Sequence, residues 1–111
     1  MSLHALGWNA RLEAASQVFL GSNLQPMRVA REDRDRYTLL MPEGAVPGVL
    51  AGRYRHEART RAGMPAVGDW VMAHHEPGSP ATIAALLPRA SAFLRKVAGE
   101  TTEEQVVAAN I

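Results

Sequence analysis

Glycine and proline divide residues 25–88 into short segments, and this division constrains the fold more than any other feature of the sequence. Glycines stand at positions 44, 48 and 52, and later breaks fall at "EPGSP" and at Pro88. Between these breaks, apolar and polar residues alternate as they do in strands with one buried face. We therefore expect a mainly β domain of about five short strands, arranged as an antiparallel barrel or a sandwich.

Local signals place the individual elements. Residues 27–41 predict two strands joined by the charged hairpin "REDRDR". The glycine-rich stretch 44–58 favours a bent or bulged strand, with "RYR" in an extended conformation. Further strands are expected through 70–72 and 83–87. The opening stretch 5–21 fits either an amphipathic helix or an irregular arm, and Thr101 with Glu104 forms a capping box that predicts a helix at the end of the chain.

Size and composition exclude several classes of protein. A chain of 111 residues is expected to form one domain with a modest core. No apolar run approaches the roughly 20 residues that span a bilayer, and the first residues lack the order of a secretory signal, so we expect a cytoplasmic protein without membrane contact. The sequence contains no cysteine, which removes disulfides, thiolate nucleophiles and cysteine-bound zinc within these residues.

Two stretches of the chain are locally basic. "RYRHEARTR" (53–61) holds four arginines against one glutamate, and residues 89–96 hold three cations and no acid. In an extended segment Arg53 and Arg55 share one face, where each guanidinium can take a phosphate. "REDRDR" alternates in sign, which is typical of a self-neutralising hairpin tip. The candidate contacts for a polyanion such as RNA are therefore Arg53, Arg55, His56, Arg59, Arg61, Arg89, Arg95 and Lys96.

Each basic stretch also has a plainer interpretation. The arginines of 53–61 can form a solvated face paired with Glu57 or with the acids of the 31–36 hairpin. The cations of 89–96 can dock a following domain instead of RNA. The sequence leaves both alternatives open.

Other residues that could carry chemistry favour structural roles. With two each of tryptophan, tyrosine and phenylalanine, stacking along single-stranded RNA is disfavoured, and recognition of the shape and backbone of folded RNA is favoured. Trp70 fits a core position better than a surface stacking platform. Asp69, which follows Gly68, is better explained as a residue that stabilises a turn than as an acid–base catalyst. The "HHE" run at 74–76 offers at most two converging ligands and favours a surface loop over a metal site.

Several motifs, in order, connect the chain to a known family. "LGWN", "RVAREDRDRYTLL", "GRYR", "PAVGDWV", "IAALLPRASAFLRK" and "EEQVVAANI" together resemble the N-terminal part of the RsgA family of ribosome small-subunit-dependent GTPases, also called the YjeQ or EngC family. The resemblance implies a five-stranded Greek-key OB-fold barrel at 25–89, an N-terminal arm at 1–24 and an exit linker at 90–111 with a short helix. A circularly permuted GTPase domain and a zinc-binding domain would then follow outside these residues.

The same resemblance implies a function for the parent protein. The barrel would dock on ribosomal RNA of the small subunit late in its maturation, as a monomer, and would work with a GTPase domain of the same polypeptide. The sequence contains no phosphate loop and no guanine-reading motif, so we expect no catalysis and no cofactor within these residues, whereas the full-length protein would use GTP, Mg²⁺ and Zn²⁺. A protein-binding or interdomain barrel is the alternative, and a stand-alone enzyme has little support.

Overall fold

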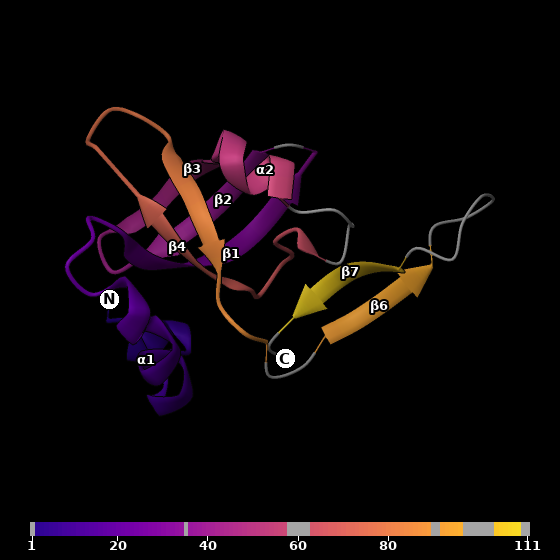
Figure 1. Ribbon diagram of the computed structural model, residues 1–111, viewed down its shortest axis with the longest axis horizontal. Coiled ribbons are helices and arrows are strands. Elements are labelled where there is room, and N and C mark those ends of the chain that lie inside the picture. Colours follow the sequence, from indigo (N-terminus) through magenta and orange to yellow (C-terminus); the bar gives the residue numbers. More distant parts are fainter. Residues whose placement is uncertain (1, 35, 58–62, 90–91, 97–103, 110–111) are drawn as a thin grey trace.

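A computed structural model describes residues 2–34, 36–57, 63–89, 92–96 and 104–109, with side chains described up to Arg89 except that of Glu57. Three short helical segments come first, and β-strands dominate the rest (Figure 1). The elements in chain order are η1 (His4–Leu6), α1 (Ala10–Ser16), η2 (Gln17–Phe19), β1 (Gln25–Asp33), β2 (Arg36–Met41), β3 (Gly44–Leu50), α2 (Gly52–Glu57), β4 (Trp70–His74), β5 (Ala81–Leu86), β6 (Ala92–Lys96) and β7 (Glu104–Ala109).

The first five strands close into a barrel in the order β1-β2-β3-β5-β4. β1 is long enough to pair with β2 through its second half and with β4 through its first half, and this double pairing closes the sheet. All pairings are antiparallel except β3 with β5, which run parallel. This is the OB-fold order, and the expectation of a small mainly β barrel of this type is confirmed.

Strand alternation fills the inside of the barrel. Tyr37, Leu39 and Met41 of β2 are buried, while the residues between them are more exposed, as a period of two requires. The inner core consists of Met27, Val29, Tyr37, Leu39, Met41, Leu50, Val71, Ala73, Ala81 and Ile83. Register shifts occur in β1, between Val29 and Arg31, and at Met72/Ala73 of β4. β3 keeps a continuous register with β2, so no bulge interrupts this pairing in the stretch for which a bent or bulged strand was expected.

The N-terminal arm forms helical turns that pack against the outside of the barrel (Figure 1). Asn9 caps α1 by accepting the backbone N–H of Leu12 at 3.0 Å, and Leu12 is buried. Trp8 meets Trp70 of β4 edge to face, with ring centroids 5.0 Å apart. Because the arm covers its outer side, β4 is buried on both faces, and the expectation that Trp70 belongs to the core is confirmed.

Two local predictions are wrong. Residues 52–57, expected to be extended, form α2, because Tyr54 docks onto the inner core and Arg55 N–H donates to Ala51 C=O to form the first turn. Residues 104–109, expected to be helical, form β7, which pairs antiparallel with β6. Val106 and Val107 are β-branched and favour strands, and a helix this short gains little without tertiary packing. Thr101 lies outside the described residues.

Candidate nucleic-acid interface

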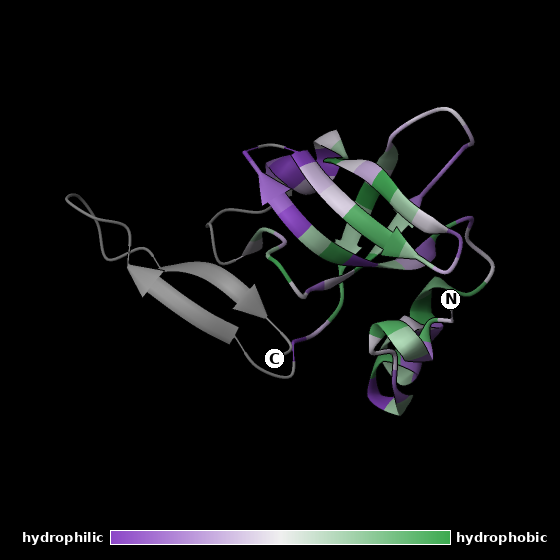
Figure 2. Cartoon of the chain, turned by 180° about the vertical axis from the view of Figure 1, so that it is seen from behind, coloured by the Kyte–Doolittle hydropathy of each residue, from purple (hydrophilic) through white to green (hydrophobic). Residues whose placement is uncertain are grey.

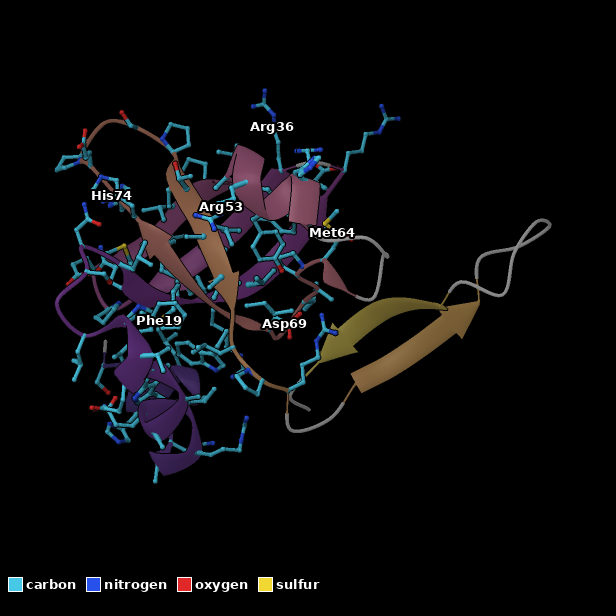
Figure 3. All side chains as sticks on the ribbon, in the orientation of Figure 1. Phe19, Arg36, Arg53, Met64, Asp69 and His74 are labelled. Atoms are coloured by element: carbon cyan, nitrogen blue, oxygen red, sulfur yellow. The ribbon has the colours of Figure 1, made fainter. Side chains whose placement is uncertain are left out.

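Two basic segments that are separate in sequence meet at one end of the barrel. Arg36 starts β2 and pairs with Val49 near the end of β3, so the β1–β2 tip lies beside the start of α2, which begins at Gly52. In Figure 3, Arg36 projects from the top of the barrel, and Arg53 lies lower, beside α2 and over β5. Figure 2 shows the hydrophilic colour gathered there, over the end of β1 and over α2. We call this surface the basic end and define it by its exposed residues Arg31, Arg34, Arg36, Arg53, Arg55 and His56.

α2 distributes its polar residues differently from the extended segment that the sequence suggested. In a helix, residues two apart point to nearly opposite sides, so Arg53 and Arg55 do not share a face. Arg53 and His56, three apart, do. Tyr54 points inward and packs against the barrel core, which leaves Arg53, Arg55 and His56 exposed around it. α2 therefore presents its cations on two sides rather than as one stripe.

Tyr54 anchors α2 to the barrel. Its hydroxyl donates to the backbone carbonyl of Gly63 at 2.7 Å. Burial, together with the negative charge of Asp69, raises the pKa of the Tyr54 phenol well above its ordinary value. The phenol is therefore neutral at physiological pH and acts as a hydrogen-bond donor that fixes the helix.

The β1–β2 tip adds three arginines that the sequence-based choice of contacts left out. Arg34 adopts a left-handed backbone conformation, with φ 56°, at the turn. Arg31 and Asp33 form an ion pair of 3.8 Å with both side chains more than two-thirds exposed, so the pair contributes little stability and dissociates readily when another anion approaches. A pocket of about 230 Å³ lies beside this pair, lined by Arg31, Asp33, Arg36, Tyr37, Thr38 and Pro47.

One signal in the sequence could have identified these residues. In OB folds the β1–β2 loop flanks the β2–β3 surface, where oligonucleotides bind. The alternating charges of "REDRDR" concealed this position, because carboxylates of the same segment balance its arginines.

Beyond Arg36, the outer face of β2 and β3 carries small and apolar side chains, of which Leu40 packs against the cluster under the arm. By alternation, Thr38 and Leu40 of β2 face outward beside Ala45, Pro47 and Val49 of β3. The aromatic rings whose side chains are described lie elsewhere: Trp8 of the arm against Trp70 of β4, Phe19 packed against that cluster, and Tyr37 and Tyr54 packed in or against the barrel core. The absence of rings among these described outer residues favours recognition of an RNA backbone over stacking on bases.

Arg89, a predicted contact, lies in an internal ion pair. Its Nε donates to Asp69 Oδ1 at 2.8 Å, and its Nη2 donates both to Asp69 Oδ2 at 2.7 Å and to the Met64 carbonyl at 2.9 Å. Asp69 is fully buried and also accepts the Ala66 N–H at 2.7 Å, as expected for a residue that holds a turn. This geometry gives the Arg89 guanidinium a structural role inside the barrel, and its contact with RNA stays a prediction.

The remaining predicted residues are placed only in part. Arg59 and Arg61 lie outside the described residues. Arg95 and Lys96 belong to β6, where they pair with Gln105 and Glu104 of β7. In the "HHE" run, His74 Nε2 lies 3.3 Å from Glu76 Oε1, and His74 Nδ1 lies 3.4 Å from the Asn23 carbonyl oxygen. Both are contacts near the protein surface. Within the described part of the chain, no three potential metal ligands lie together.

Comparison with known proteins connects this barrel to a family. No protein-family model matches the chain. The protein of Opitutus terrae named small ribosomal subunit biogenesis GTPase RsgA is 40% identical over 120 aligned positions, which cover 100% of this chain and 33% of that protein. Proteins of the same name from Oceanobacillus iheyensis and Syntrophotalea carbinolica are 44% and 40% identical, over 76% and 86% of this chain and 24% and 26% of their own length. The chain belongs to the RsgA family.

The alignment and the fold agree on which part of an RsgA protein this is. The chain spans about a third or less of the length of the curated relatives it matches. The match to the Opitutus terrae protein covers the whole chain and so includes the arm and the barrel, and the "GDWV" motif enters β4 at Trp70. The chain is therefore the OB-fold portion of an RsgA-family protein. Within the described residues, no helix is long and apolar enough to cross a membrane.

Proposed function

We propose that this barrel is the RNA-binding domain of a GTPase that acts late in the maturation of the small ribosomal subunit, and that it docks on ribosomal RNA through the basic end. The observation that carries the proposal is the meeting of exposed arginines from two distant segments at one end of an OB barrel, beside the surface that such folds use for ligands. The name shared by the relatives, small ribosomal subunit biogenesis GTPase, supports the choice of RNA and of the subunit.

The chemistry of the surface fits a folded RNA. Guanidinium groups bind phosphate oxygens in a bidentate manner, and those of the basic end project from a helix and from a hairpin tip, so they can reach phosphates of different strands. The largely apolar β2–β3 face beside them presents no described aromatic ring for stacking on bases. Binding would therefore depend strongly on salt and weakly on RNA sequence.

The activity of the whole protein lies outside this chain. We propose that a GTPase domain of the same polypeptide binds GTP and Mg²⁺, that a further domain binds Zn²⁺, and that contact of the barrel with the subunit is coupled to GTP hydrolysis. The chain itself supplies recognition and no catalytic group. The protein would act in the cytoplasm, where ribosomal subunits mature, and as a monomer on each subunit.

Salt-dependent binding of variants to small-subunit ribosomal RNA tests the proposed surface. Arg53→Gln with Arg55→Gln should reduce the slope of log affinity against log salt by roughly 0.7–0.9 for each phosphate that the variant no longer binds. Replacement of Arg31, Arg34 and Arg36 by glutamine should reduce the slope in the same way. Arg11→Gln, which removes a cation from α1 away from the basic end, is the matched control and should leave the slope as in the unsubstituted chain. An unchanged slope in both basic-end variants would refute the assignment.

A protein-binding barrel is the second candidate, and the apolar β2–β3 face favours it. A barrel of this kind would use that face to contact its own GTPase domain or a ribosomal protein. Mixing the chain in parallel with naked ribosomal RNA and with a separately produced GTPase domain separates the two functions. Binding to the domain without binding to RNA would support the second candidate.

A further inference from the structure

A buried ion pair connects the point where the chain leaves the barrel to the loop that precedes β4. Leu87 and Arg89 follow β5, and Leu87 N–H donates to the Trp70 carbonyl at 2.9 Å. Arg89 then reaches both carboxylate oxygens of Asp69 and the Met64 carbonyl. The exit of the chain is thus fixed to residues 64–69 by three hydrogen bonds from a single guanidinium.

The same loop continues to α2. Gly63, next to Met64, accepts the Tyr54 hydroxyl at 2.7 Å. Asp69 lies near enough to Tyr54 for its charge to influence the phenol. Contacts therefore run without a break from α2, through Tyr54, Gly63 and Met64, to Arg89 at the exit. Figure 3 shows Met64 just beyond the end of α2, with Asp69 farther along the same side of the barrel.

The other exit contact does not touch α2. Arg11 of α1 donates to the Pro88 carbonyl at 2.6 Å, and this bond holds the exit against the arm. Arg28 holds the arm to the same loop, because Nη1 donates to the Leu6 carbonyl at 2.6 Å and Nε to the Gly68 carbonyl at 3.2 Å. The path to α2 thus runs through Arg89, and the Arg11 contact serves as the comparison.

We propose that Asp69 and Arg89 form a latch through which the position of α2 and the direction of the chain at its exit from the barrel depend on each other. Displacement of α2 moves Gly63 and Met64, which shifts a carbonyl that Arg89 binds. Displacement of the exit moves the guanidinium and, through Met64, the acceptor of Tyr54. If the proposed function holds, RNA bound at α2 would change how the segment after Arg89 is presented. The latch itself is a property of the barrel and is testable without RNA.

Hydrogen exchange followed by NMR on the chain tests the latch in both directions. Tyr54→Phe keeps the ring in the core and removes the hydroxyl that donates to Gly63. Exchange of the Arg89 Nε–H should then accelerate at least about tenfold, while exchange of the Leu12 N–H, which donates to Asn9 within the arm, changes less than about twofold. The contrast matters because general loosening of the fold would accelerate both groups.

The reverse perturbation starts at the exit. Arg89→Lys keeps the positive charge and loses the planar fork that reaches two oxygens at once. Exchange of the α2 amide Arg55 N–H, which donates to the carbonyl of Ala51 just before the helix, should accelerate at least about tenfold. Arg11→Lys, which weakens the other exit contact, should leave that amide unchanged. Coupling between two sites is reciprocal. Unchanged exchange of the Arg89 Nε–H in Tyr54→Phe, or of the Arg55 N–H in Arg89→Lys, would therefore overturn the proposal.

Discussion

Replacement of Arg89 by methionine should destabilise the barrel far more than loss of an ordinary surface ion pair. Three N–H donors converge on the Asp69 carboxylate, and Arg89 supplies two of them. Asp69 has 0% and Arg89 17% of its side chain exposed, so methionine leaves a charged group with one partner in a site that water does not reach. Removal of one member of a buried pair costs about 3–5 kcal/mol of unfolding free energy.

That loss is a large share of the total for a domain of this size, whose unfolding free energy is about 5–15 kcal/mol. Urea unfolding monitored by tryptophan fluorescence measures it directly, and the melting temperature should fall by at least about 10 °C. Arg31→Met is the matched control. It removes an exposed pair and should change the unfolding free energy by less than about 0.5 kcal/mol.

The double substitution Asp69→Leu with Arg89→Met separates loss of the pair from loss of packing. Without the carboxylate no charge is left buried, so the double variant should be more stable than Arg89→Met alone, although the Ala66 N–H then loses its acceptor. A loss below about 1 kcal/mol for Arg89→Met, or a double variant less stable than that single variant, would refute this reasoning.

Further predictions concern the arm and α2. Trp8→Ala removes a buried ring that meets Trp70 and should cost about 3–5 kcal/mol of unfolding free energy, measured in urea; a loss below 1 kcal/mol would mean that the arm is not part of the core. Gly7 has φ 106°, and a methyl group there would overlap the Arg28 guanidinium, so Gly7→Ala should cost about 1–3 kcal/mol in the same assay. Because the pKa of Tyr54 is raised on folding, its contribution to stability is complete below about pH 10 and is lost as the pH rises further; Tyr54→Phe should therefore reduce the alkaline decline in urea midpoint, and an equal decline in both proteins would contradict this.

The strands and the barrel were predictable because their signals are local. Alternation in residues 27–41 and 70–72, together with glycine and proline breaks, depends only on neighbours in the sequence. The buried position of Trp70 was predictable for the same reason, since both residue sets of β4 are largely apolar. Its actual partner, Trp8 in the arm, lies 62 positions earlier, and no local pattern indicates that contact.

The errors share one physical cause, which is that distant contacts outweighed local patterns. The six residues of α2 are too few to display a helical period, and Tyr54 holds them helical by docking onto strands remote in sequence. The internal partner of Arg89 was not predictable for the same reason, because Asp69 stands twenty positions away. The capping box at Thr101 favoured a helix, but pairing with β6 supplies β7 with hydrogen-bond partners instead. The two sides of the basic end likewise meet only in the folded barrel.

Binding of the chain to purified small ribosomal subunits across a salt series, with large subunits as the control, tests the central proposal most directly. We predict binding that favours the small subunit, weakens steeply as salt increases, and is reduced when Arg53 and Arg55 are replaced by glutamine. Absence of small-subunit binding at low salt, or equal binding to both subunits, would contradict the proposal that this barrel recognises the small subunit.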